Sequence, residues 1–355
     1  MITNLALQAF KSFPLINLEL RPLTLLTGLN NCGKSSILQS IRMLFKSSRL
    51  TDPLLPGHGS LDELRSQMAP PDAPIVISCD FDAKPSQTLI IRHDGVDTPG
   101  SAPITEYVSA ERLGPRPTLP LYRAIDEAPL IGEKGEYVLD FLHKLNDTII
   151  PSQLHHEKSE GITLQYEIRG WLSEIAPGVE FSFKVDPKRD QAHAEYNSYR
   201  PMNVGFGLSY SLPILAALLG MVAKPPIGGW PTTWGTFWEG LRIFHGTLLM
   251  VENPEAHLHP EGQTAMGRLI ALSVACGLQV IVETHSDHLI DGIRLAVKEK
   301  LIPHNNIFIH YFTKDSNGVS QVTTPQLYPN GKLSHWPKGF FDQALRNRSK
   351  LAMRD

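Results

Sequence analysis

Hydrophobic and polar positions along this chain follow patterns that predict an α/β protein. Residues 2–10 and 15–20 alternate between apolar and polar side chains, which predicts a pair of strands at the start of the chain. Leucines dominate residues 23–26 and predict a short buried strand, while residues 36–45 have the spacing of an amphipathic helix. A strand and a helix are therefore expected on either side of a short connecting segment.

Further strands follow this first helix. Residues 75–81 and 88–92 predict an antiparallel strand pair. Residues 107–116 end another strand in a charged turn. In that turn, Arg112 and Arg116 either contact phosphate or nucleic acid or form salt bridges on the surface.

The middle of the chain, residues 120–200, has a less regular pattern. Residues 136–150 and 164–175 have helical spacing, and residues 179–185 alternate like a strand. No heptad repeat is sustained, so we expect no long coiled-coil arm. The simplest interpretation is an inserted, mainly helical lobe.

The last third of the chain returns to alternating strands and helices. Residues 203–215 open an apolar helix. Within residues 245–260 an apolar strand ends directly in acidic residues, and residues 278–286 predict another buried strand that ends in polar side chains. Residues 307–312 and 319–327 predict a closing pair of strands.

Residues 224–240 are expected to form a loop, because they hold two proline-containing turns. The loop is rich in aromatic side chains, namely Trp230, Trp234, Phe237 and Trp238. Such a group either packs locally or forms an interface with a partner.

Composition describes an ordinary folded protein. The chain has 355 residues, of which 42% are hydrophobic and 19% charged, with a net charge of −3. This charge gives no global reason to expect nucleic-acid binding. Three isolated cysteines suit a reducing cytoplasm, and we see neither a signal sequence nor an apolar run of the roughly 20 residues that a membrane helix needs. We therefore expect a cytoplasmic protein without a membrane partner.

The segment between the first buried strand and its helix carries the strongest chemical signal. Residues 27–36 fit the pattern G-x-x-x-x-G-K-[ST], in the strand–turn–helix context that the pattern requires. Backbone N–H groups of such a turn point at a phosphate, helped by the helix N-terminus. We expect Lys34 to face solvent and to reach the β- and γ-phosphates, and Ser35 to bind Mg²⁺. The nucleotide-binding set is Gly28, Asn30, Asn31, Cys32, Gly33, Lys34, Ser35 and Ser36.

Two later segments offer matching chemistry. Glu252 ends an apolar strand, where a carboxylate can hold Mg²⁺ beside bound phosphates. Gly205, Gly207 and Ser209 lie just before an apolar helix, which makes either an anion-binding N-terminus or a plain glycine turn.

With these motifs identified, the chain resembles the ABC-class ATPases of the RecF/SMC/OLD kind, from its first strand to about residue 345. Residues 10–13 resemble the N-terminal strand of that family, and residues 28–36 its Walker A motif. Residues 204–209 resemble a variant signature motif. Residues 250–260 resemble Walker B with the D-loop, and residues 283–286 the segment with the switch histidine.

The resemblance implies a fold and a mechanism. The fold is an ABC-ATPase head, a P-loop NTPase with a mixed sheet and an antiparallel β-subdomain. Two ATP molecules with Mg²⁺ would be sandwiched between two heads, where Gly205, Gly207 and Ser209 contact the γ-phosphate in trans. Glu252 would bind Mg²⁺, and His285 would hydrogen-bond the γ-phosphate or the attacking water.

One position departs from the family. Asn253 stands where the catalytic glutamate is usual, and an amide cannot accept a proton as a general base. Either Glu255 takes that role or hydrolysis is slow.

The resemblance also implies a division of the chain. Residues 1–119 would form the first half of the head, residues 120–200 the inserted lobe and residues 201–345 the second half, followed by a basic tail at 346–355.

Three functions are compatible with these motifs and with the family resemblance. The first is an ATP-hydrolysing dimer, or a higher oligomer, that acts as sensor or regulator for an effector such as a nuclease in DNA repair or anti-phage defence, with nucleic-acid contact possible. The second is a scaffold that binds ATP and hydrolyses it poorly. The third, a self-contained nuclease of the OLD kind, is disfavoured because only about 70 residues follow His285, too few for a TOPRIM domain.

Overall fold

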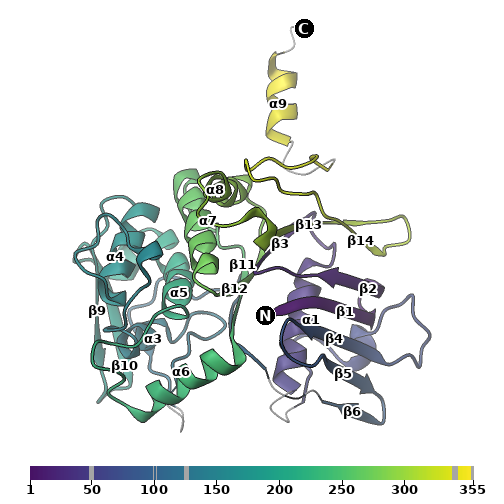
Figure 1. The fold of residues 1–355 in the computed structure, drawn as a ribbon, viewed down its shortest axis with the longest axis horizontal. Helices are drawn as coiled ribbons and strands as arrows, with labels where there is room; N and C mark the ends of the chain where they lie inside the picture. The colour runs from purple at the N-terminus through teal and green to yellow at the C-terminus, as the bar shows by residue number, and fades with distance from the viewer. Residues whose placement is uncertain (48–51, 99, 101, 124–127, 338–342, 353–355) are drawn as a thin grey trace. The chain divides into compact units, whose positions relative to one another are not determined.

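The computed structural model describes all residues except 48–51, 99, 101, 124–127, 338–342 and 353–355 (Figure 1). The chain divides into two compact units. Unit 1 comprises Met1–Ala102, His285–Asp287 and Pro303–Asp355, and unit 2 comprises Pro103–Thr284 and His288–Ile302. In the described residues, no helix has the length and apolar character needed to cross a membrane.

Unit 1 begins with an antiparallel sheet in the order β2-β1-β4-β5-β6. The expected pair at the start of the chain is confirmed, because Leu5 pairs with Leu18 and Leu7 with Ile16. Leu5, Leu7 and Leu18 are buried, so the alternation reflects one core-facing side of the sheet. The strands are β1 (Ile2–Phe10), β2 (Phe13–Glu19), β4 (Ile75–Phe81), β5 (Gln87–Arg92) and β6 (Gly95–Asp97).

A second set of strands in unit 1 leads into the first helix. β3 (Leu23–Gly28) runs parallel to β13 (Ile307–Lys314), and β13 pairs antiparallel with β14 (Ser320–Thr323). β3 is buried at five of its six positions, as a parallel strand requires. α1 (Lys34–Ser47) follows β3 after a short loop.

Unit 1 also holds short helical segments and the C-terminal helix. These are α2 (Leu61–Leu64), η3 (His304–Asn306) and α9 (Gln343–Ala352). The expected basic tail coincides mainly with α9, and its last residues, 353–355, lie outside the described part of the chain.

His310 on β13 gives unit 1 a pH-dependent stability. Its Nε2–H donates to the Glu19 carbonyl at 2.9 Å, while Nδ1 lies 2.7 Å from the Thr324 hydroxyl and accepts from it. Burial lowers the pKa of His310 to about 4, and only the bond to Glu19 opposes this. The folded state therefore disfavours the proton, and the histidine's contribution to stability is complete above pH ~6.5 and declines as the pH falls toward 4.

We expect the free energy of unfolding to fall by on the order of 3 kcal/mol between pH 7 and pH 4 from this residue alone. Urea titrations over that range check it, with His310→Gln as the comparison because glutamine keeps a donor and an acceptor without titrating. Equal pH slopes in the two proteins would contradict this assignment.

Unit 2 is built on three parallel strands in the order β12-β11-β7. They are β7 (Ile104–Val108), β11 (Thr247–Glu252) and β12 (Gln279–Glu283), and the central residues of β11 and β12 are apolar and buried. Helices of the unit include α5 (Phe206–Gly220), α7 (Pro260–Ala275) and α8 (Asp287–Lys298), of which Asp287 belongs to unit 1. A Cβ on Gly267 of α7 would lie 2.1 Å from the Leu289 carbonyl oxygen of α8, so glycine allows these two helices to touch.

Residues 120–200 contain strands as well as helices. The helices are α3 (Val138–Lys144), η1 (Ser152–Leu154) and α4 (Leu164–Ile175), and η2 (Pro201–Asn203) follows. β8 (Leu119–Pro120), β10 (Gln191–Tyr196) and β9 (Phe181–Asp186) form a small antiparallel sheet in that order. Both boundaries expected for an inserted lobe, at 120 and 200, fall inside unit 2.

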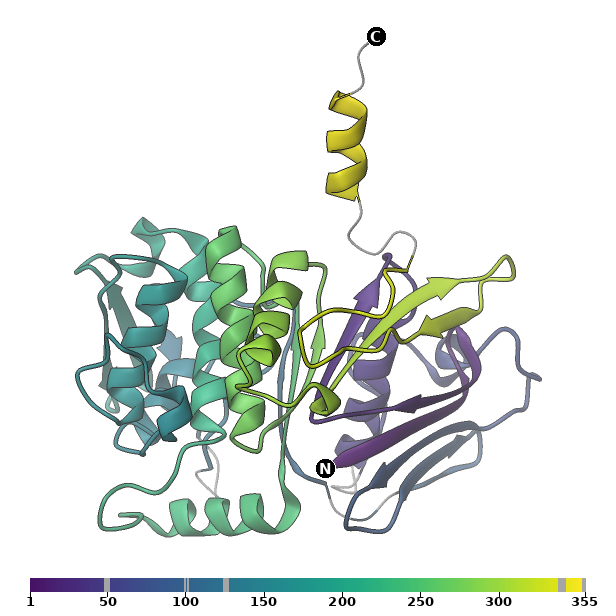
Figure 2. The same ribbon diagram turned by 45° about the horizontal axis from the view of Figure 1, so that its top comes forward.

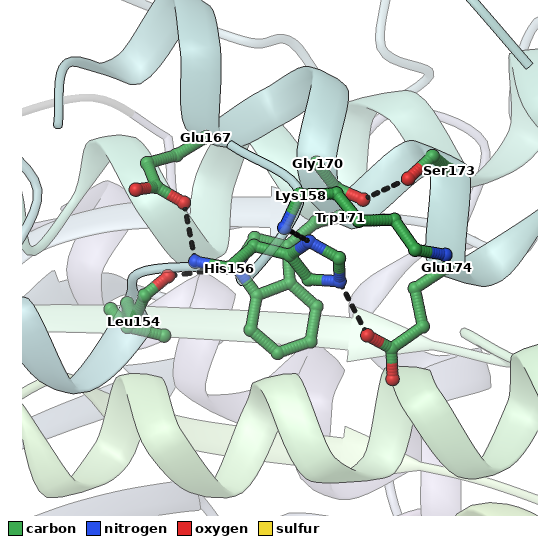
Figure 3. Close-up of polar contacts among 8 residues, drawn as sticks. All are labelled: Leu154, His156, Lys158, Glu167, Gly170, Trp171, Ser173 and Glu174. Carbon is green, nitrogen blue, oxygen red and sulfur yellow. Dashed lines mark hydrogen bonds and ion pairs between the residues drawn. The ribbon is translucent and has the colours of Figure 1, made fainter. Parts of the chain in front are cut away.

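A buried polar cluster ties the loop after η1 to α4 (Figure 3). The backbone N–H of His156 donates to the Glu167 carboxylate at 2.8 Å. The imidazole Nε2–H of His156 donates to the Glu174 carboxylate at 2.5 Å. Trp171 donates its indole N–H to the Leu154 carbonyl at 2.9 Å. Burial is the main cause that raises the pKa of Glu167. These groups satisfy one another, so we assign the cluster a structural role.

The prediction of a loop over residues 224–240 is wrong for its second half, because helix α6 (Thr233–His245) begins there. Trp230 packs on this helix because Gly235 leaves room for its ring, 2.3 Å from where a Cβ would be. Its ring centroid lies 5.4 Å from that of Trp234 and 5.9 Å from that of Trp238. The tryptophans therefore form a local packing cluster, whereas Phe237 is 60% exposed.

Candidate functional site

The loop between β3 and α1 adopts a backbone that its sequence makes possible. Gly28 and Gly33 have φ of +130° and +93°, and Asn31 has φ of +61°. A Cβ on Gly28 would lie 2.2 Å from the Phe312 carbonyl oxygen, and one on Gly33 would lie 2.6 Å from the Phe13 ring. Glycine is therefore needed at both positions, because other residues rarely adopt such φ values and because a Cβ would collide with a neighbouring atom.

Lys34 is buried, and the expectation that it faces solvent is wrong. The residue is 3% exposed. Its ammonium group donates to the Leu29 carbonyl at 2.7 Å and to the Gly28 carbonyl at 3.2 Å. The side chain folds back over the loop because these carbonyls provide acceptors for its charge.

The remaining loop residues divide into an exposed and a buried group. Asn30, Asn31 and Ser35 are exposed, with Ser35 in the first turn of α1. Cys32 and Ser36 are buried. The Cys32 carbonyl accepts from the Ser320 hydroxyl at 2.9 Å, which ties the loop to β14. The N-terminus of a 14-residue helix, a lysine and a serine hydroxyl thus meet at one end of unit 1, an arrangement suited to phosphate and Mg²⁺.

His285 belongs to the same unit and interacts with Lys34. Burial is the first cause that lowers the pKa of His285, and the positive charge of Lys34 lowers it further. The imidazole is therefore neutral at pH 7 and able to accept as well as donate a hydrogen bond. Two residues that are 251 positions apart in the sequence are brought together here.

In unit 2, Glu252 is oriented by β7 and the turn that follows it. The Tyr107 hydroxyl donates to one carboxylate oxygen at 2.9 Å, and the Ala110 backbone N–H donates to the other at 3.1 Å. Each carboxylate oxygen can accept a second partner, so the group remains suited to a hard cation. In the described residues no group of three or more His, Cys, Asp and Glu side chains is placed to hold a metal by itself. Any ion bound by Glu252 would therefore need ligands other than such a side-chain cluster.

Asn253 and Glu255 lie in the turn after β11. Asn253 has φ of +44°, in the left-handed region, and its N–H donates to the Glu283 carbonyl at 2.8 Å. Its side-chain oxygen is buried and has no hydrogen-bond partner among the described residues. The Thr284 hydroxyl donates to the Glu255 carboxylate at 2.9 Å. The carboxylate that could act as base is thus held in place by the residue that follows β12.

Arg112 is a member of this site that neither sequence interpretation anticipated. It is 4% exposed and donates to the backbone carbonyls of Glu252 and Asn253, both at 2.7 Å. It is therefore not a surface ion pair. Arg116, four residues further on, is exposed.

The start of α5 presents free backbone N–H groups. Gly205 is the N-cap residue, is exposed and has no atom within 4 Å of where a Cβ would be. A Cβ on Gly207 would lie 2.6 Å from the His257 carbonyl oxygen. Glycine is therefore needed there because any larger residue would collide with the backbone at His257. The expectation that Gly207 and Ser209 precede the helix is wrong, because α5 already begins at Phe206; the Ser209 hydroxyl hydrogen-bonds Tyr196. Of the three predicted signature residues, Gly205 is the one whose surroundings leave room for a ligand.

Comparisons with known proteins identify a family and a fold. A family model described as an AAA ATPase domain matches residues 1–171 and 245–290, more than half of the chain. A model described as a protein of unknown function (DUF3696) matches residues 302–351. No curated protein matches the chain.

Solved structures show the same fold. An SMC head bound to the C-winged helix domain of ScpA is 14% identical, with a TM-score of 0.55, over 92% of this chain and 98% of that one. The SMC head domain with an extended coiled coil from Pyrococcus furiosus, bound to the C-terminal domain of ScpA, is 14% identical, with a TM-score of 0.54, over 99% of both chains. The chain belongs to the AAA ATPase domain family, and its fold is that of an SMC head.

Proposed function

We propose that this protein binds ATP with Mg²⁺, hydrolyses it as a head-to-head dimer and serves as sensor or regulator of a partner effector. The observation that carries the proposal is the phosphate loop of unit 1, with Lys34 over the loop carbonyls and neutral His285 beside it. The oxygens of a bound triphosphate are charged acceptors. Lys34 would therefore leave the two neutral loop carbonyls and hydrogen-bond the phosphates instead.

The roles of the remaining residues follow from their chemistry and from the family resemblance. Ser35 and Glu252 are each proposed as Mg²⁺ ligands from the family resemblance, and a bound ion would supply positive charge that neutralises the phosphates. Asn253 would orient a water molecule, and Glu255 would accept its proton as the water oxygen attacks the γ-phosphorus. The bond from the γ-phosphorus to the bridging oxygen breaks, and ADP leaves with that electron pair. His285 would donate to a γ-phosphate oxygen.

Dimerisation is proposed through the start of α5, which would meet the γ-phosphate bound by a second copy. The exposed N-cap Gly205 and the free N–H groups that follow it support this role. The two similar SMC heads are bound to ScpA domains, which supports a protein partner here. We also propose that the effector is a nuclease and that the protein acts in DNA repair or anti-phage defence.

The dimer proposal is tested at Gly205. An aspartate there is a good N-cap and would accept hydrogen bonds from the same N–H groups that a phosphate needs. We therefore expect Gly205→Asp to keep or slightly raise thermal stability, to keep ATP binding and to abolish association with a non-hydrolysable ATP analogue in sedimentation velocity.

Gly240→Asp is the matched control, because Gly240 also has open space around its Cβ position and lies in α6 of the same unit. It should associate as the wild type does. A Gly205→Asp protein that still associates on adding the analogue would rule out the sandwich. The Ser209 position is less suited to this test, since its hydroxyl already bonds Tyr196.

A hydrolysis-poor scaffold is the second candidate, favoured by one observation. Asn253 cannot act as a base, and its left-handed backbone suits asparagine better than glutamate. Steady-state turnover separates the two functions, because a scaffold would bind ATP tightly and release almost no phosphate.

A further inference from the structure

Arg112 places a rigid, charged fork at the carboxyl end of β11. Its Nη1 donates to the Ser109 carbonyl at 2.9 Å and to the Glu252 carbonyl at 2.7 Å, while Nη2 donates to the Asn253 carbonyl at 2.7 Å. The fork thus joins the turn after β7 to the turn after β11, across 140 residues of sequence. A planar guanidinium directs donors from two separate nitrogens along fixed directions, whereas a lysine ammonium is a single, freely rotating group that cannot reproduce this geometry.

The backbone held by this fork is strained at Asn253. A residue other than glycine rarely has a positive φ, and it keeps such a conformation only where its surroundings fix it. Here the Asn253 N–H is bound by the Glu283 carbonyl, and its carbonyl accepts from both Arg112 and the Ala256 N–H, the latter at 3.1 Å. These contacts set the direction of the Asn253 side chain and the start of the turn that carries Glu255.

The side chain of Arg112 is itself well fixed. Its guanidinium lies 5.4 Å from the centre of the Tyr210 ring on α5. Burial lowers the pKa of Arg112 to about 10, against the opposing charges of Glu255, Tyr210 and Glu252, so the group stays protonated at neutral pH. The Glu252 carboxylate bonds Tyr107 and Ala110 instead, which leaves Arg112 to hold the backbone.

We infer that Arg112 is a positioning residue for ATP hydrolysis, which fixes the left-handed turn at Asn253 and so aims the side chains of Asn253 and Glu255. The inference rests on the proposed function, because it assigns Asn253 and Glu255 to the hydrolytic step. Arg112 itself touches neither nucleotide nor water in this scheme.

The test compares Arg112→Lys with Arg242→Lys in the full-length chain. Arg242 is a matched control, because burial also lowers its pKa, its Nη1 donates to the Ala223 carbonyl at 2.7 Å and it lies 4.6 Å from the Trp238 ring. Arg112→Lys should lower kcat by about tenfold or more while KM changes little, since a small misplacement of reacting groups slows chemistry and not binding. Arg242→Lys should keep the wild-type kcat.

Two further measurements separate positioning from general destabilisation. Hydrogen exchange of the peptide covering residues 250–258 should be faster in Arg112→Lys and unchanged in Arg242→Lys. Guanidinium at millimolar concentration should restore part of the turnover of Arg112→Gly. A wild-type kcat with wild-type exchange in Arg112→Lys would overturn the inference, as would an equal loss in Arg242→Lys. If the wild type releases no phosphate but exchange at 250–258 still depends on Arg112, the proposed hydrolysis fails and the structural part of the inference stands.

Discussion

Replacing Lys34 with alanine is expected to abolish tight ATP binding. The ammonium group of Lys34 is the positive charge at the phosphate loop, and hydrogen bonds from charged groups contribute about 1.5–3 kcal/mol each. Loss of bonds to two phosphates therefore predicts a Kd at least about 100-fold higher. Calorimetric titration of ATP with Mg²⁺ measures it directly.

Because Lys34 is buried and bonds the loop carbonyls, its removal also affects the loop itself. Lys46→Ala is the matched control, since Lys46 lies on the same helix and donates to the Leu54 carbonyl at 2.5 Å. Both variants should remain folded by circular dichroism, and Lys46→Ala should bind ATP as the wild type does. A folded Lys34→Ala protein with unchanged affinity would refute the site.

Replacing Glu255 with glutamine is expected to lower ATP turnover by at least about 100-fold while ATP binding stays near the wild-type value, because loss of a general base costs about 10²–10⁴ in rate. Glutamine can still accept the hydrogen bond from Thr284, so the turn should keep its structure. Phosphate release under saturating ATP is the measurement. Glu261→Gln, at an exposed position in the first turn of α7, is the control.

Wild-type turnover in Glu255→Gln would show that Glu255 is only structural. The slow scaffold would then be favoured, with Asn253 and His285 left to position water.

Much of the fold could be predicted from sequence because its signals are local. The alternation of β1 and β2 and the glycine pattern before α1 depend on residues close together in the chain, and the structure confirms those elements. Helix α6 was missed because proline turns and tryptophans at 224–240 suggested a loop, whereas Gly235 lets Trp230 pack on a helix.

The parts of the site that sequence could not predict depend on distant partners. Arg112 reaches carbonyls that are 140 and 141 residues away, and nothing in its neighbours along the chain indicates this. The burial of Lys34 and the bond between Ser209 and Tyr196 likewise follow from tertiary packing. The sequence motifs identified which residues are suited to bind a nucleotide. Only the structure could show which of these side chains hydrogen-bond other parts of the same chain.

The most direct test of the account is Mg²⁺-dependent phosphate release by the wild type, measured per chain over a wide range of protein concentration. A site completed by a second copy predicts turnover per chain that rises with concentration and then levels off, with Lys34→Ala at background throughout. Phosphate release no faster than that of Lys34→Ala, or turnover per chain that is constant over the whole range, would contradict an ATP-hydrolysing dimer.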